Sequence, residues 1–191
     1  MDKKEIIAFF DEIASDWDDM QVRNEEVIGE ILHKGGITEG VKVLDIACGT
    51  GVLFPDYISL GAEVTGIDIS ANMVEKAREK YPQIKVICAD AAEYAFEEKF
   101  NAVMIYNAFP HFMHPEKLIG NLATALKENG RLTVAHGISE KELAKCHSGR
   151  AEKISVPLMK KEVLAEMMSL YFNVDVLISD ERMYMVSGVK K

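Results

Sequence analysis

Apolar and polar positions alternate along the chain with two periods, one typical of helices and one typical of strands. In residues 3–17, apolar side chains recur every three or four positions (Ile6, Phe10, Ile13, Trp17), which predicts an amphipathic helix. A second such helix is predicted to end at Gly35-Gly36. From residue 41 onward, short apolar runs alternate with helical segments, a pattern typical of a parallel sheet covered by helices. Five parallel strands are expected, at residues 41–46, 62–67, 84–89, 100–106 and 131–135.

Residues with special backbone or capping properties place the helices between these strands. A helix is predicted at residues 52–60, a second from the cap Ser70 to Pro82, and a third from Pro115 to Gly130. A capping box at residues 139–142 predicts a further short helix.

The last part of the chain has a different pattern. Two alternating segments, 172–178 and 183–186, flank Asp180-Glu181 and predict a terminal antiparallel hairpin. The expected fold class is therefore α/β, with a doubly wound, seven-stranded and mostly parallel sheet that ends in this hairpin. The length of 191 residues fits a single domain. Its expected parts are a helical lid or cover (1–36), a cofactor-binding core (37–136), a substrate-recognition insertion (137–159), and a final helix with the hairpin (160–191).

The first strand runs into a glycine turn that carries the clearest chemistry. Residues 43–51 read Val-Leu-Asp-Ile-Ala-Cys-Gly-Thr-Gly, and a glycine turn between a strand and a helix lets the backbone approach a nucleotide closely. A dinucleotide fingerprint needs a third glycine three residues after Gly51, where this chain has Phe54. Asp45 is poorly placed beside a pyrophosphate but suits a cationic amino group. The turn therefore argues against a nicotinamide dinucleotide.

Two further acids follow the next two strands. Asp68 lies at the end of the second strand, where a carboxylate can accept hydrogen bonds from both ribose hydroxyls. The alternative is a simple turn residue. If Asp68 serves the ligand, its replacement should leave the fold largely intact. Asp90 follows the third strand and is either a ligand contact or the cap of a short helix.

Composition narrows the classes of partner. The formal net charge of −9 argues against a nucleic-acid partner, because phosphates require a basic face. No apolar run approaches the roughly 20 residues of a membrane span, and no signal-type segment follows the charged N-terminus. Cys48, Cys88 and Cys146 form no CxxC pair, and no two histidines have metal-ligand spacing with a carboxylate partner. We expect a cytoplasmic protein without disulfides or a metal; its oligomeric state is open.

These motifs resemble those of class I S-adenosylmethionine-dependent methyltransferases of the small-molecule type. The run Asp45-Ile46-Ala47-Cys48-Gly49-Thr50-Gly51 is similar to the first motif of that family, and residues 10–18 are similar to its N-terminal FDxxAxxYD motif. In the family this N-terminal segment closes over the cofactor, which makes Trp17 a candidate for a cation–π contact to a sulfonium.

The resemblance implies S-adenosylmethionine as the cofactor. Asp45 would face the methionyl ammonium, Asp68 the ribose and Asp90 the adenine amine, with Ile69 and Met73 as walls of the adenine site. The cofactor contacts that it implies are Trp17, Asp45, Ala47, Cys48, Gly49, Gly51, Asp68, Ile69, Met73, Asp90, Ala91 and Asn107.

The loop after the fourth strand is the expected acceptor region. Amine-directed members of the family often show Asn-Pro-Pro-Tyr there, whereas this chain has Asn107-Ala108-Phe109-Pro110, so a nucleobase or glutamine acceptor is not favoured. His111 and His136 follow strands four and five and are the main candidates for a general base, with Tyr106 as an orienting group. His114 is either a third candidate or a helix cap. A base is needed only for a protonated acceptor, because a thiolate needs little help.

We therefore expect an enzyme that transfers a methyl group from S-adenosylmethionine to O, N or S of a small molecule. One alternative is a protein that binds this cofactor as a sensor or partner subunit without transferase activity. Another is a nicotinamide-dependent oxidoreductase, which the missing third glycine and the terminal hairpin oppose.

Overall fold

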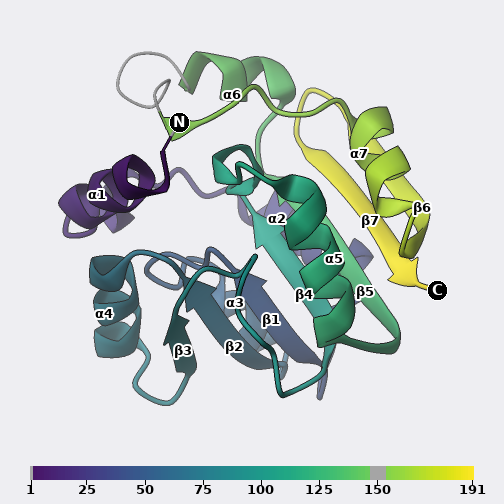
Figure 1. Ribbon diagram of the computed structural model, residues 1–191. Helices are drawn as coiled ribbons and strands as arrows, with labels where there is room; N and C mark the ends of the chain where they lie inside the picture. Colours follow the sequence, from purple (N-terminus) through teal and green to yellow (C-terminus); the bar gives the residue numbers. More distant parts are fainter. Residues whose placement is uncertain (1, 147–153) are drawn as a thin grey trace.

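Seven strands form one sheet in the order β3-β2-β1-β4-β5-β7-β6 (Figure 1). The computed structural model describes residues 2–146 and 154–191. Strands β1 to β5 run parallel, and β7 lies antiparallel between β5 and β6. The predicted fold class is therefore confirmed. The strands are β1 Lys42–Ile46, β2 Glu63–Asp68, β3 Lys85–Cys88, β4 Phe100–Tyr106, β5 Leu126–His136, β6 Phe172–Ser179 and β7 Tyr184–Lys190.

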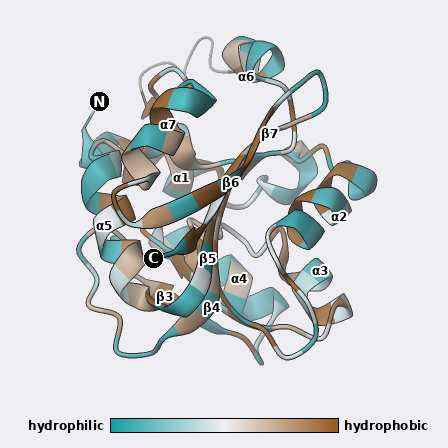
Figure 2. Ribbon diagram, turned by 90° about the vertical axis from the view of Figure 1, so that its right-hand side faces the viewer, coloured by the Kyte–Doolittle hydropathy of each residue, from teal (hydrophilic) through white to brown (hydrophobic). Residues whose placement is uncertain are grey.

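Helices cover both faces of the sheet and bury two cores (Figure 2). α2, α3 and α4 contribute to one core, and α5 and α7 contribute to the other. The strand order reverses between β1 and β4, the switch point at which open α/β sheets bind ligands. No helix among the described residues has both the length and the apolar character needed to cross a membrane. The helices are α1 Lys3–Ile13, η1 Asp18–Met20, α2 Glu25–Lys34, α3 Phe54–Ser59, α4 Ala71–Lys80, η2 Phe109–His111, α5 Pro115–Ala125, α6 Glu140–Cys146 and α7 Lys161–Met168.

Capping residues set several helix starts at their predicted positions. The Ser70 hydroxyl accepts a hydrogen bond from the Met73 backbone N–H at 3.1 Å and so caps α4. The Ser139 hydroxyl accepts one from the Glu142 backbone N–H at 3.2 Å, at the start of α6. Pro115 opens α5, where its missing N–H has no cost.

One predicted helix is too long. The sequence predicts a helix up to Gly130, but α5 ends at Ala125, and Leu126 already pairs with Phe100 of β4. The next residues interrupt the ladder, and Asn129 among them has a left-handed backbone with φ of 59°. Leu126 continues the apolar spacing of the helix, so only its pairing partner in the fold decides between helix and strand.

The region 137–159 joins β5 to α7. It contains α6, and its described residues form no strand. His147, which the sequence places at the end of this helix, lies outside the described residues. The region returns to the loop after β4, where the Val156 backbone N–H donates to the Pro110 carbonyl at 2.9 Å. The expected insertion therefore meets the expected acceptor loop.

Gly66 of β2 provides a test of the packing beneath the glycine turn. A Cβ built on Gly66 would lie 2.7 Å from both Cys48 Sγ and Phe54 Cζ, and both of these side chains are buried. We expect Gly66→Ala to lower the free energy of unfolding by about 1–3 kcal/mol, because the neighbours must move. Gly29→Ala is the control, since no atom lies within 4 Å of a Cβ at that exposed position in α2.

The control substitution should raise the free energy of unfolding by about 0.5–1 kcal/mol, because alanine loses less backbone entropy than glycine in a helix. Urea denaturation measures both variants. Equal stability of Gly66→Ala and the wild type would contradict the tight packing described here.

Candidate functional site

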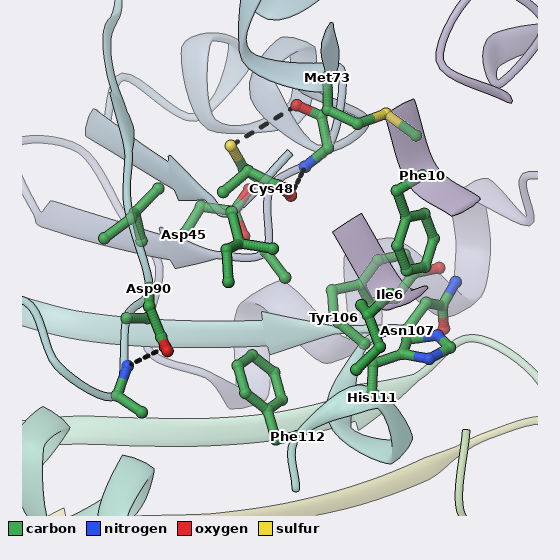
Figure 3. Close-up of a pocket in the computed structure, with 18 of the residues that line it drawn as sticks. Ile6, Phe10, Asp45, Cys48, Met73, Asp90, Tyr106, Asn107, His111 and Phe112 are labelled. Atoms are coloured by element: carbon green, nitrogen blue, oxygen red, sulfur yellow. Dashed lines mark hydrogen bonds between the residues drawn. The ribbon is translucent and has the colours of Figure 1, made fainter. Parts of the chain in front are cut away.

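A pocket lies at the carboxyl-terminal edge of the parallel strands (Figure 3). Its volume is about 1290 Å³ when counted out to the opening into solvent. The loops after β1, β2, β3 and β4 line it, and α1 adds Ile6 and Phe10 from the start of the chain. Of the residues expected to contact the cofactor, all except Gly51 line this pocket.

The turn after β1 has a backbone conformation that favours glycine. Ala47, Gly49 and Gly51 have φ angles of 53°, 55° and 86°, so left-handed residues alternate along the turn. Glycine adopts this conformation freely, whereas Ala47 is strained there, as residues at ligand sites often are. The helix predicted at residues 52–60 begins only at Phe54, because the turn continues up to that residue.

Phe54 explains why a third glycine is missing. Its ring is fully buried and makes an edge-to-face contact with Tyr81, with ring centroids 5.4 Å apart. A Cβ built on Gly51 would lie 2.6 Å from the Phe54 ring. Gly51 is therefore needed for the packing of the Phe54 ring and does not line the pocket.

Asp68 joins the loops that follow β1 and β2. Its Oδ2 accepts a hydrogen bond from the Gly49 backbone N–H at 2.8 Å, and its Oδ1 accepts one from the Ser70 N–H at 2.9 Å. Burial raises the pKa of this carboxyl, although these N–H groups act in the opposite direction. Each oxygen has a second lone pair available to a ligand hydroxyl. Asp68 also connects two loops of the fold, so we expect its replacement to lower the stability of the protein as well as its affinity for a ligand.

Asp45 is a buried acid without a hydrogen-bond or ion-pair partner among the described residues. It is 3% exposed, and it accepts no hydrogen bond from the described part of the chain. Burial, reinforced by the negative charge of Asp68, holds the pKa of the Asp45 carboxyl well above its usual range. Such a group attracts a cation. Among the described residues no three His, Cys, Asp or Glu side chains could hold a metal ion together.

Asp90 lies toward the opposite end of the pocket from His111 (Figure 3). Its Oδ1 accepts a hydrogen bond from the Ala92 backbone N–H at 2.9 Å, and a turn follows, so the alternative reading of Asp90 as a helix cap is wrong. Lys3 Nζ lies 2.5 Å from Asp90 Oδ2, and this contact is the main cause that raises the pKa of Lys3. Asp90 is therefore shared between the pocket and the first helix. Ile69 and Met73, the expected walls of the adenine site, also line the pocket, as does the expected cofactor contact Ala91.

The N-terminal segment is bound to the same ligand loops by polar contacts. Asp11 Oδ1 accepts a hydrogen bond from Ser70 Oγ at 2.5 Å, and Asp18 Oδ1 accepts one from Thr50 Oγ1 at 2.6 Å. Trp17 lies against the glycine turn and lines the pocket. The loops after β1, β2 and β3 thus each hold part of this segment.

The two candidate bases lie in different surroundings. His111 lines the pocket, and its Nδ1 is 2.9 Å from the carbonyl oxygen of Ile154. Because a carbonyl oxygen only accepts, Nδ1 donates, and a neutral ring has its lone pair on Nε2. His136 is fully buried beside Tyr184, its partner in β7, and does not line the pocket. The hairpin strand covers His136, so the interpretation of His136 as a base is withdrawn.

Tyr106 and Asn107 end β4 at the pocket. Asn107 has a left-handed backbone with φ of 54°, and its Oδ1 accepts a hydrogen bond from the Gly137 backbone N–H at 2.9 Å. The Tyr106 hydroxyl occupies the space that a Cβ on Gly137 would need. Burial raises the pKa of Tyr106, so this residue is a neutral hydroxyl near pH 7. It can orient a ligand but does not act as a base.

Sequence reasoning missed several side chains that line the pocket. The helical spacing of Ile6 and Phe10 predicts that they form an apolar face, but it does not predict what that face covers. Lys3 lines the pocket without any local signal in the sequence, whereas Phe112 belongs to the loop that the sequence predicts as the acceptor region. The similarity of residues 10–18 to a known N-terminal motif was the one available indication for Phe10.

The sheet order and the terminal hairpin define the class I methyltransferase fold, and the glycine turn and the acids after β1 and β2 lie at its ligand edge. The model of a family described as a methyltransferase domain matches residues 43–130. Residues 43–130 are therefore similar to this methyltransferase domain family, as the sequence motifs predict, and S-adenosylmethionine is the cofactor of this family.

Curated relatives are similar to the chain in sequence, and solved structures share its fold. A demethylmenaquinone methyltransferase of Renibacterium salmoninarum is 30% identical over 146 residues, which cover 71% of this chain and 60% of that protein. A ubiquinone biosynthesis O-methyltransferase of Rhodopseudomonas palustris is 32% identical over 100 residues, covering 50% and 40%. The chain therefore spans less than two thirds of these relatives. Magnesium protoporphyrin IX methyltransferase from Synechocystis shares the fold, with a TM-score of 0.71, 19% identity and coverage of 100% of both chains.

The burial of the Asp45 carboxyl predicts that its replacement by asparagine stabilises the protein at high pH. The folded state raises the pKa of this carboxyl, so its contribution to stability is fully present below the unfolded pKa of about 3.9. It is lost as the pH rises through the folded pKa. Since asparagine does not ionise, ligand-free Asp45→Asn should become more stable than the wild type as the pH increases from 4 to 8. Thermal unfolding across this range measures the difference.

The same variant should bind S-adenosylhomocysteine about 10- to 100-fold more weakly, because a charge-assisted contact worth about 1.5–3 kcal/mol is lost. Asp19→Asn, at an exposed position outside the pocket, is the control for both measurements. A variant less stable than the wild type at pH 8 would show that Asp45 has a stabilising partner and would refute this interpretation.

Proposed function

We propose that the protein transfers a methyl group from S-adenosylmethionine to a hydroxyl group of a small molecule. The main support is that one pocket joins the acids after β1 and β2 to His111. The tautomer of His111 supports oxygen over sulfur, since a lone pair on Nε2 is useful only when the acceptor arrives with a proton to remove. A relative named as an O-methyltransferase agrees with this choice.

The residues of the pocket fit the cofactor. Bound S-adenosylmethionine supplies an electrophilic methyl group and a neutral thioether leaving group. In this proposal Asp45 binds the ammonium group, Asp68 the ribose hydroxyls and Asp90 the adenine amine, sharing its carboxylate with Lys3. The indole of Trp17 provides an aromatic face for the sulfonium.

At the acceptor end, His111 acts as the general base. Its Nε2 would take the proton of the acceptor hydroxyl, and Nδ1–H would stay bonded to the Ile154 carbonyl. Ile6, Phe10 and Phe112 form apolar walls that align the acceptor and exclude water. Tyr106 donates or accepts a hydrogen bond without changing its charge.

Residues 1–36 act as a lid in this proposal, and 137–159 contribute to acceptor recognition. The support for a lid is the kind of contact that holds α1. Ile6 is the only buried residue of this helix, while Asp11 and Lys3 bind loops of the cofactor site. A helix attached mainly by polar contacts opens at a lower free-energy cost than one packed into the core.

A screen of small phenols, alcohols, amines and thiols for release of S-adenosylhomocysteine tests the proposed activity. With a hydroxyl acceptor such as catechol, His111→Asn should lower kcat by about 10²–10⁴-fold and remove the acid limb of the pH profile. The asparagine amide can still donate to the Ile154 carbonyl, so the loop should stay in place. Affinity for S-adenosylhomocysteine, measured by titration calorimetry, should stay within a few-fold.

His33→Asn, on the exposed end of α2 and outside the pocket, is the matched control and should keep full activity. With a thiol acceptor, His111→Asn should have little effect. Full activity of His111→Asn on catechol would exclude His111 as the base. Binding of S-adenosylhomocysteine without turnover of any acceptor would favour a sensor or partner subunit.

Hydrogen exchange tests the lid. On saturation with S-adenosylhomocysteine, amide exchange in residues 3–20 should slow, because the ligand adds contacts beneath this segment. Exchange in α7, on the far side of the second core, should not change. The fluorescence of Trp17 should change as well. Unchanged exchange in both regions, with ligand bound, would leave the segment as a permanent cover.

A further inference from the structure

Phe10 lies between the cofactor end and the acceptor end of the pocket. Its ring makes edge-to-face contacts with Trp17, at a centroid distance of 5.7 Å, and with His111, at 5.1 Å. Figure 3 shows Phe10 and Ile6 beside His111, although the two segments are about 100 residues apart in the chain. One side chain of the first helix thus contacts both the expected sulfonium neighbour and the candidate base.

The position of Phe10 is fixed from the cofactor side. The next residue, Asp11, accepts hydrogen bonds from Ser70 Oγ at 2.5 Å and from the Asn72 backbone N–H at 3.1 Å. Ser70 also donates its own N–H to Asp68, the proposed ribose ligand, at 2.9 Å. A ligand bound to Asp68 is therefore connected through two hydrogen bonds to the residue beside Phe10.

The imidazole of His111 is fixed from the opposite side. Its Nδ1 donates to the Ile154 carbonyl at 2.9 Å, and the neighbouring Pro110 carbonyl accepts a hydrogen bond from Val156 at 2.9 Å. The edge-to-face contact with Phe10 also favours one orientation of the ring about its Cβ–Cγ bond, because such pairs have a preferred geometry.

We propose that Phe10 is a positioning residue that sets the plane of the His111 ring, so that Nε2 meets the acceptor hydroxyl only when α1 is closed on the loop after β2. This inference rests on the proposed function, in which His111 is the base. Ile154 selects the tautomer, and Phe10 selects the orientation. The N-terminal helix therefore completes the acceptor side of the site as well as covering the cofactor.

Phe10→Leu tests the proposal, since leucine keeps an apolar side chain but has no aromatic ring. With catechol as the acceptor probe, kcat should fall about 10²-fold, the effect of a misplaced catalytic group. The affinity for S-adenosylhomocysteine should change by no more than a few-fold. With a small thiol as acceptor, kcat should change little, because a thiolate does not need the base. Phe10→Tyr should restore kcat for catechol, since it restores the ring.

Phe9→Leu is the matched control. Phe9 is the neighbouring ring on α1 and contacts Phe10, but it does not line the pocket. Its replacement should leave kcat for both acceptors within about a few-fold of the wild-type value. Three results would each overturn the proposal in favour of a structural role. They are an equal loss of kcat in Phe9→Leu and Phe10→Leu, an equal loss of kcat with catechol and with the thiol, and a parallel loss of S-adenosylhomocysteine affinity.

A second measurement does not depend on turnover. In the S-adenosylhomocysteine complex, ¹⁵N spectra of the imidazole should show one Nδ1-protonated form of His111 in the wild type and in Phe9→Leu. Phe10→Leu should show exchange between ring states. If no acceptor is methylated but this spectral difference is found, the proposed function fails and the positioning role stands. If the wild-type enzyme is active but the spectra of all three proteins agree, the positioning role fails alone.

Discussion

The carboxylate of Asp68 is the contact on which the rest of the site depends. It accepts hydrogen bonds from Gly49 in the loop after β1 and from Ser70 in the loop after β2. Ser70 in turn caps α4 and binds Asp11 of the N-terminal segment. One buried group therefore fixes the glycine turn, the start of a helix and the position of α1. The consequence is a second negative charge close to Asp45, whose pKa is raised by burial and further by this charge.

Much of the fold follows from local patterns, because strands and helices bury side chains with different periods. The five parallel strands and the terminal hairpin occur where the apolar runs predict them, and Ser70 and Pro115 open their helices. The error at Leu126 shows where local patterns fail. Its spacing suits a helix, but its partner Phe100 lies 26 residues away in the chain. The energy of that pairing therefore depends on the fold and cannot be deduced from the local sequence.

The candidate site also has residues that local patterns predict and residues that they do not. Asp45, Asp68 and Asp90 are predictable, since parallel strands bring their carboxyl ends to one edge of the sheet. His136 fulfils the same condition, yet Tyr184 of the hairpin covers it, and a strand pattern does not reveal such packing on a neighbour. The bond between Lys3 and Asp90 joins residues 87 apart, and nothing in either local sequence predicts it.

The two ends of the pocket are built from different parts of the chain, and this separation limits what relatives can reveal. The acids of the cofactor end lie within residues 43–130, the part that the family model matches. The acceptor end also needs Phe10 from α1 and the carbonyl of Ile154, both outside that range. A cofactor site must match the charges and hydroxyls of one molecule, whereas an acceptor wall needs only apolar side chains of suitable shape and a few polar groups. Relatives can therefore share the cofactor end and differ in their acceptors.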